Sequence, residues 1–175
     1  QEDHVRHAAD AGGWSYTIWR PQIIIGHAHH APMNLLAAIA VYAALRRSEN
    51  LPLTWPGSRK TGVTEVVDAR LLAQAIHFSL DHDNFANQTF NITNGDVVHW
   101  PDLWPALAEA LHMEGDDPAD QGAGEPFSLS ETCYPAEPLW QTLIGRHQLQ
   151  PSTIRELVGD SFFYADALFN TADRP

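Results

Sequence analysis

Apolar residues recur at helical spacing in three stretches of the first half of the chain. The clearest is residues 32–47, where apolar side chains fall at i, i+1, i+4, i+7 and i+8, and two arginines suit the carboxyl end of the helix dipole. A shorter pattern in residues 2–11 ends at Gly12-Gly13, which fit a helix C-cap. Asp68 is a good N-cap for a third helix over residues 69–79. The pattern therefore predicts three helices in this region.

Short apolar and β-branched runs separate these helices. Ser15–Ile25 reads as one buried parallel strand whose ladder ends at Pro21. Leu51–Trp55 and Gly62–Val67 are expected to be two short strands around a Pro-Gly turn, and Thr89–Thr93 alternates as a strand does. The predicted order is α-β-α-β-β-α-β, which indicates an α/β fold.

The last third of the chain has a different pattern. Trp100 opens an amphipathic helix, in which Pro105 predicts a kink or a later start. Residues 114–137 have seven acidic residues, no basic ones and several Gly and Pro, so we expect a solvated linker or excursion there. Residues 139–144 and 151–158 then predict two more helices.

Composition restricts the classes of partner. Lys and Arg number 10 against 22 Asp and Glu, a formal net charge of −12, which argues against a broad binding surface for nucleic acid or an anionic membrane. The longest apolar run, Leu35 to Leu45, is shorter than a membrane-spanning helix. A single cysteine, Cys133, excludes an intrachain disulfide and fits a reducing compartment, so a cytoplasmic location is the expectation.

The chain contains no glycine-rich dinucleotide loop of the Gly-x-Gly-x-x-Gly type, although its strand order is that of the later half of a nucleotide-binding α/β domain. We therefore expect the sequence to be a fragment whose nucleotide-binding front half precedes Gln1.

Several short motifs, in order, resemble the progesterone 5β-reductase and iridoid synthase-like branch of the extended short-chain dehydrogenases/reductases. The resemblance covers residues 1–113, with a weaker continuation at residues 149–169. The matching stretches are Gln1-Glu2-Asp3, Arg20-Pro21, Ile24, Gly26, Met33-Asn34, Val41-Tyr42-Ala43, Pro56-Gly57-Ser58, Asp68-Ala69-Arg70, Phe90-Asn91 and Asn94-Gly95-Asp96-Val97.

The resemblance implies the later half of a Rossmann-like NAD(P)-binding domain and a mostly helical substrate-binding cap. Residues 1–113 would interleave the two, residues 114–137 would be the acidic excursion, and residues 138–175 would be a truncated helical cap segment. The implied activity is NADPH-dependent reduction of an activated carbon–carbon double bond in a small enone-type substrate, with NADH left open. The catalytic Tyr and Lys of the family are expected upstream of Gln1, and the resemblance allows for a homodimer.

The same resemblance assigns candidate site residues. Pro21, Gln22, Ile23 and Ile24 match a loop that lies against the nicotinamide end of the cofactor in such enzymes. His27, Met33 and Asn34 match the border of the substrate pocket. For Asn34 and Met33, a first-turn residue and a core filler are the structural alternatives.

His27-Ala28-His29-His30 places three imidazoles within four residues. Imidazole nitrogens are ligands for zinc, copper or nickel, but nothing nearby completes a metal shell, so we predict no metal site. Substrate contact and an exposed loop remain the other interpretations.

Two further functions stay open on the sequence. One is a sugar-nucleotide epimerase or dehydratase of the same superfamily, which a uridine-nucleotide titration would distinguish. The other is a non-catalytic binding module without the nucleotide-binding half, which would be stable and would not bind NADPH.

Overall fold

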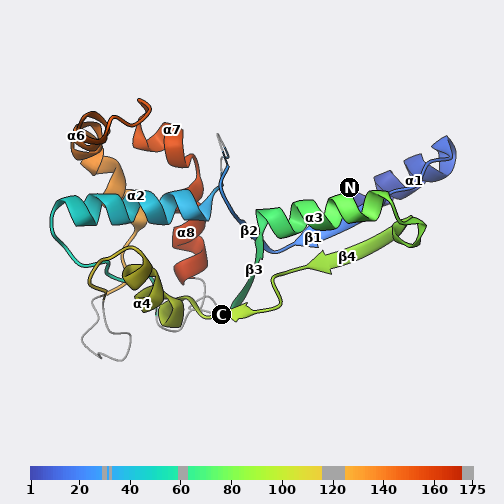
Figure 1. Cartoon of the computed structure of the whole chain (residues 1–175), viewed down its shortest axis with the longest axis horizontal. Coiled ribbons are helices and arrows are strands. Elements are labelled where there is room, and N and C mark those ends of the chain that lie inside the picture. The colour runs from blue at the N-terminus through green and yellow to red at the C-terminus, as the bar shows by residue number, and fades with distance from the viewer. Residues whose placement is uncertain (29–30, 32, 59–62, 116–124, 171–175) are drawn as a thin grey trace. The chain divides into compact units, whose positions relative to one another are not determined.

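The computed structural model describes residues 1–28, 31, 33–58, 63–115 and 125–170 (Figure 1). The chain divides into two compact units. Gln1–Gly26 and Thr64–Val97 form the first, which we call the sheet unit, and His27–Val63 and Val98–Pro175 form the second, the helical unit. The chain therefore passes between the units at three points, after residues 26, 63 and 97.

The sheet unit is built on parallel strand pairs, which can be followed in Figure 1. Strand β1 pairs with β4 from Thr17↔Gln88 to Pro21↔Ile92, and β2 pairs with β3 from Ile23↔Val66 to Ile25↔Asp68. The short strand β5 follows β3 in the second sheet. Its elements are α1 (Glu2–Gly12), β1 (Thr17–Pro21), β2 (Ile23–Ile25), β3 (Thr64–Asp68), α3 (Ala69–Leu80), η1 (Asp83–Phe85), β4 (Gln88–Ile92) and β5 (Val97–Val98).

The single strand predicted for residues 15–25 is wrong in one respect. Pro21 ends β1, as expected, but the apolar run that follows does not prolong the same ladder. Ile23–Ile25 instead forms β2 in a separate sheet, beside β3. The chain changes sheets at Gln22, so residues on either side of it have different neighbours.

The predicted helix ends in the sheet unit are confirmed. Gly13 adopts φ 67°, and its N–H donates to the Ala9 carbonyl, the αL C-cap that glycine favours. The Asp68 carboxylate accepts the Arg70 N–H at 2.7 Å and caps α3. Arg70 also contacts this carboxylate through its guanidinium, which lowers the Asp68 pKa to about 2.

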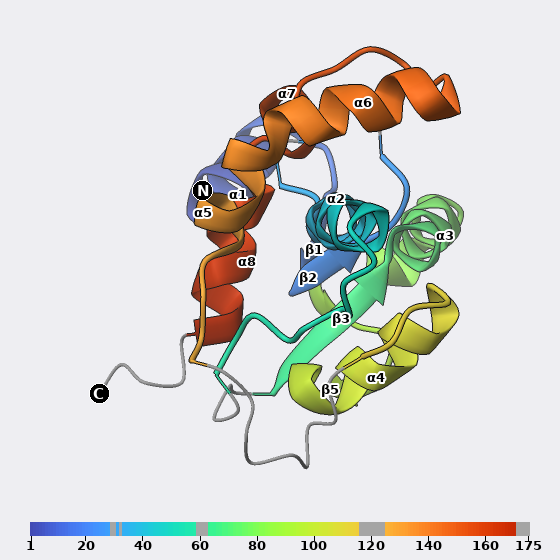
Figure 2. The same cartoon turned by 90° about the vertical axis from the view of Figure 1, so that its left-hand side faces the viewer.

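The helical unit packs around α2, which Figure 2 shows nearly end-on with α6 and α7 on one side and α8 on another. Its interior holds large buried side chains such as Tyr42, Trp104, Phe162 and Phe169. Its elements are α2 (Leu35–Ser48), α4 (Trp100–Ala110), α5 (Leu129–Cys133), η2 (Tyr134–Ala136), α6 (Glu137–His147), α7 (Ile154–Val158) and α8 (Ser161–Asn170).

Residues 51–55, predicted as a strand, make only an isolated parallel bridge between Leu53 and Gly115. The carbonyls of this segment are bonded by side chains, not by a neighbouring strand. Arg46 Nε donates to the Pro52 carbonyl at 2.9 Å, Trp104 Nε1 to the Leu53 carbonyl at 2.9 Å, and the Tyr42 hydroxyl to the Thr54 carbonyl at 3.0 Å. A ladder is therefore not needed to satisfy these backbone groups.

Two expectations for the last third of the chain need correction, and one helix there was not predicted. Helix α4 begins at Trp100 and contains Pro105, so the proline does not delay its start. The acidic excursion is helical from Leu129 onward, with Leu129 and Cys133 buried, because Asp166 of α8 accepts the Leu129 N–H at 2.7 Å and ties α5 down. Helix α8 was not predicted as a separate element, although its Phe162 and Phe169 are buried.

Parallel strands joined through helices give the α/β class that the sequence predicted. Within the described residues, no helix combines the length and the apolar character required to cross a bilayer.

Candidate functional site

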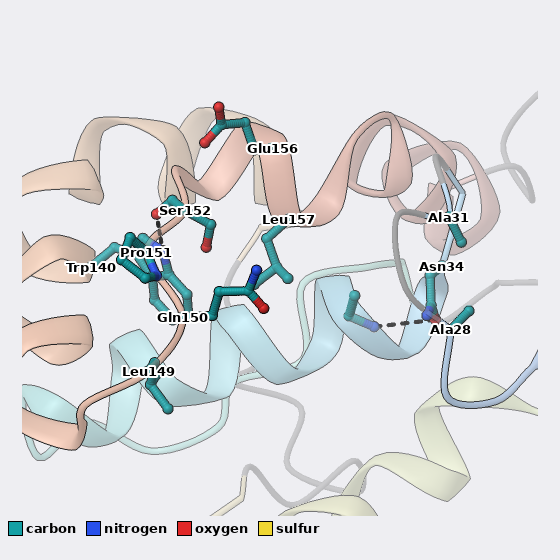
Figure 3. A pocket seen from close by; sticks show the side chains of 11 residues that line it. Ala28, Ala31, Asn34, Trp140, Leu149, Gln150, Pro151, Ser152, Glu156 and Leu157 are labelled. Atoms are coloured by element: carbon teal, nitrogen blue, oxygen red, sulfur yellow. Dashed lines mark hydrogen bonds between the residues drawn. The ribbon is translucent and has the colours of Figure 1, made fainter.

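A pocket of about 580 Å³ lies wholly within the helical unit, and Figure 3 shows the side chains that line it. Its volume is within the range of roughly 300–1,000 Å³ typical of small-molecule sites. One wall is the segment that leads into α2 and its first turn, and the other is α6, α7 and the connection between them. The lining residues are Ala28, Ala31, Asn34, Ala37, Trp140, Leu149, Gln150, Pro151, Ser152, Glu156 and Leu157.

Asn34 has two roles at the first wall. It is the N-cap of α2, and its side-chain oxygen accepts the Leu36 N–H at 3.1 Å and the Ala37 N–H at 3.4 Å. Its own N–H donates to the Ser161 hydroxyl at 2.7 Å. Asn34 is 9% exposed and lines the pocket, so one buried residue both starts the helix and forms part of the cavity wall.

The facing wall is held by hydrogen bonds to one carbonyl. Trp140 Nε1 donates to the Ser152 carbonyl at 3.1 Å, and Gln141 Nε2 donates to it at 3.0 Å. Helix α6 ends where Gln148 adopts φ 52°, and the Leu149 N–H returns to the Ile144 carbonyl. The α6–α7 connection is therefore fixed at both ends, which gives the pocket a preformed wall.

The charge at the pocket edge comes from Glu156. Its carboxylate accepts the Thr153 N–H at 2.8 Å and the Thr153 hydroxyl at 3.0 Å in a capping box, and these bonds lower its pKa. Figure 3 shows it pointing away from Gln150 and Leu157, at the rim. Among the described residues that line the pocket there is no Lys, Arg or His, so its fixed charge is acidic.

A second, smaller cavity of about 310 Å³ lies within the sheet unit, at the carboxyl ends of β1 and β4. Polar side chains line most of it, among them Arg20, Gln22 and Asn91. Arg20 is oriented by Glu2 of α1, since its Nε donates to the Glu2 carboxylate at 2.7 Å. The carboxyl ends of parallel strands are where open α/β sheets bind ligands.

The four residues predicted to contact a cofactor are not all brought to this cavity. Pro21 and Gln22 line it, while Ile23 and Ile24 do not. Both belong to β2 of the other sheet, where Ile23 is buried and Ile24 is exposed because successive side chains of a strand point to opposite faces. Of the four residues, only Pro21 and Gln22 therefore share this cavity.

The three residues predicted to border the substrate also divide. Asn34 lines the pocket of the helical unit. Met33 is 63% exposed, pairs with Gly159 in an isolated bridge and does not line the pocket. His27 is exposed beside Ala28, which does line it.

The histidine cluster can be followed only in part, because His29 and His30 lie outside the described residues. In the part of the chain that the structure describes, no group of three His, Cys, Asp or Glu side chains is arranged to hold a metal ion.

Sequence reasoning missed the second wall of the pocket. Trp140 and Leu157 fit the apolar pattern of two predicted helices and carry no sign of a pocket, and Gln150 belongs to a connection with no motif. Only the break in helical spacing between residues 147 and 151 marked this connection. Its position across the pocket from the start of α2, more than a hundred residues earlier, has no local signal.

No protein-family model matches the chain. It is 31% identical over 168 residues to a protein named (S)-8-oxocitronellyl enol synthase from Antirrhinum majus, covering 95% of this chain and 42% of that protein. It is 30% identical over 158 residues to a 3-oxo-Delta(4,5)-steroid 5-beta-reductase from Arabidopsis thaliana, covering 88% of this chain and 39% of that one. The chain thus spans about two fifths of the length of these curated relatives.

Among solved structures, the chain resembles the UDP-glucose 4-epimerase of Thermotoga maritima, solved with UDP-glucose. The TM-score is 0.50 at 17% identity, over 72% of this chain and 40% of that one, a likeness of fold alone. The resemblance inferred from the sequence is therefore confirmed: the chain is a homologue of part of the proteins named 8-oxocitronellyl enol synthase and steroid 5-beta-reductase, and it has an α/β fold like that of an extended short-chain dehydrogenase/reductase.

Proposed function

We propose that the protein to which these residues belong is an NADPH-dependent reductase of activated carbon–carbon double bonds, and that the pocket of the helical unit receives the enone-type substrate. The observation that carries the proposal is the similarity, over most of this chain, to relatives whose names describe a steroid enone reductase and an enol synthase. The cofactor would supply hydride to the β-carbon of the double bond, and the nicotinamide end would meet Pro21 and Gln22.

The lining of the pocket supports a neutral, largely apolar substrate. Trp140, Leu149 and Leu157 offer apolar surface, while Asn34 and Gln150 offer polar groups that can orient a ligand. A sugar nucleotide carries a diphosphate, which proteins usually bind with cations or helix amides. The described lining contains no cation and one carboxylate, so this pocket fits an uncharged enone better than a nucleotide sugar.

Activity is tested with the product of the complete coding sequence, by following NADPH oxidation with 2-cyclohexen-1-one or progesterone. We expect oxidation that depends on the double bond, so the saturated ketone cyclohexanone serves as the control. Oxidation with neither enone would overturn the proposed activity.

The pocket itself is tested on the same complete protein, by titrating progesterone and observing the indole N–H signal of Trp140 by NMR. Ala37→Leu fills the pocket wall and should abolish the shift. Ala40→Leu is the matched control, because Ala40 lies on the same helix, is exposed and does not line the pocket. Equal effects of the two variants, or a response to UDP-glucose in place of progesterone, would contradict the proposal.

A further inference from the structure

One place where the two walls of the pocket are joined is the start of α2, which meets the corner between α7 and α8. Met33 forms an antiparallel bridge with Gly159, and the Asn34 N–H donates to the Ser161 hydroxyl at 2.7 Å. Asn34 belongs to one wall, and Glu156 and Leu157, which immediately precede this corner, belong to the other. The contact therefore connects residues that are 127 positions apart in the sequence.

Ser161 is fully buried, at 0% exposure, although serine side chains mostly lie at protein surfaces. A hydroxyl in such surroundings destabilises the fold unless it is hydrogen-bonded, and here it accepts the Asn34 N–H. Tyr134 of η2 also holds this corner in place. The Tyr134 hydroxyl donates to the Gly159 carbonyl at 3.2 Å, and the Arg155 guanidinium stacks 4.4 Å from the centre of the Tyr134 ring.

We propose that Ser161 is a positioning residue of this pocket: its hydroxyl holds the start of α2 against the α7–α8 corner and so fixes the distance between the two walls. Ser161 does not line the pocket and acts through Asn34. The inference rests on the proposed function of the pocket as an enone site. It predicts that Ser161 determines which size of enone binds.

On this proposal a large rigid enone needs contacts with both walls, whereas a small one needs contacts with only one. In the product of the complete coding sequence, we expect Ser161→Ala to weaken progesterone binding about fivefold, the effect of one ordinary hydrogen bond, and to leave cyclohexenone binding within about twofold. Ser161→Cys keeps a side chain of similar size whose sulfur is a weaker acceptor. It should change the ratio of progesterone to cyclohexenone affinity by an intermediate amount, and it can be tested if the alanine variant does not fold.

The control is Ser128→Ala, which removes a capping hydroxyl of α5 in the same unit but away from the pocket. It should lower stability without changing the ratio of the two affinities. If Ser161→Ala weakens both ligands equally, or neither, Ser161 has only a structural role and the inference is wrong.

A readout without ligand separates this inference from the proposed function. Amide hydrogen exchange at Leu36 and Ala37, whose N–H groups are bonded to Asn34, should accelerate in Ser161→Ala and not in Ser128→Ala. Wild-type protein that binds neither enone would refute the proposed function, while unchanged exchange in Ser161→Ala would refute the positioning role.

Discussion

Replacing Tyr42 by Phe removes one hydroxyl from the buried face of α2 and keeps the ring. Tyr42 is 1% exposed, and its hydroxyl donates to the Thr54 carbonyl at 3.0 Å in the segment that replaces the predicted strand. Such a bond contributes about 1 kcal/mol, and more when the acceptor stays buried without a partner. Because Thr54 is half-buried, water can reach its carbonyl only in part, so we expect a value between these two limits, a loss of about 1.5 kcal/mol in the free energy of unfolding.

The expected change in melting temperature follows from chain length. An unfolding entropy of about 2.1 cal/mol/K per residue gives about 0.4 kcal/mol/K for 175 residues, so Tyr42→Phe should lower the melting temperature by about 4 °C. Circular dichroism at 222 nm during heating, with urea midpoints as a second measure, would detect it. Tyr164→Phe is the control, since the described part of the chain offers that hydroxyl no hydrogen-bond partner. A melting temperature for Tyr42→Phe equal to that of Tyr164→Phe would refute the reasoning.

Three other outcomes are expected. Trp104→Phe removes the donor to the Leu53 carbonyl and leaves a gap beside Phe169. It should lower the free energy of unfolding, measured in urea, by about 2–4 kcal/mol. A smaller decrease than that of Tyr42→Phe would contradict this expectation. Burial raises the pKa of the Cys133 thiol to about 12, so iodoacetamide at pH 8 should modify it only after unfolding, and stability should fall as pH rises from about 9 towards 12. The Asp68 pKa is lowered to about 2, so its stabilisation of α3 is complete above the ordinary aspartate range and is lost as pH falls towards 2; NMR chemical shifts of the Arg70 amide would follow this.

Elements with signals in adjacent residues were predictable. The ends of α1 and α3 follow from Gly13 and Asp68, whose cap bonds reach only a few residues away. Helix α2 follows from its own apolar periodicity. Each of these depends on hydrogen bonds within one turn, which the sequence displays directly.

Elements that depend on distant partners were not predictable. Whether residues 51–55 form a strand depends on Tyr42, Arg46 and Trp104 reaching their carbonyls, and nothing in the segment itself indicates this. The acidic character of residues 114–137 suggested solvation, yet Asp166 on α8 captures the start of α5. Half of the pocket was invisible for the same reason, since its second wall is recruited by tertiary contacts.

The candidate site residues likewise differ in whether adjacent residues predict their position. The resemblance placed Asn34 at the substrate pocket, with a position in the first turn of a helix as the alternative; in the structure Asn34 both caps α2 and lines a pocket. Ile23 and Ile24 were grouped with Pro21 and Gln22 by their adjacency, but the change of sheet at Gln22 separates them. Proximity along the chain is a poor guide where a strand ends and the next begins at once.

The bond between Asn34 and Ser161 sets an order of events during synthesis. At roughly 5–20 residues per second, the ribosome needs about 6–25 seconds to pass from the first of these residues to the second. Until then the amide at the start of α2 has no buried acceptor, and the apolar face of that helix lacks α8 as a cover. During that interval the part of α2 that α8 covers in the folded protein stays accessible, so a chaperone that binds apolar helices can reach it.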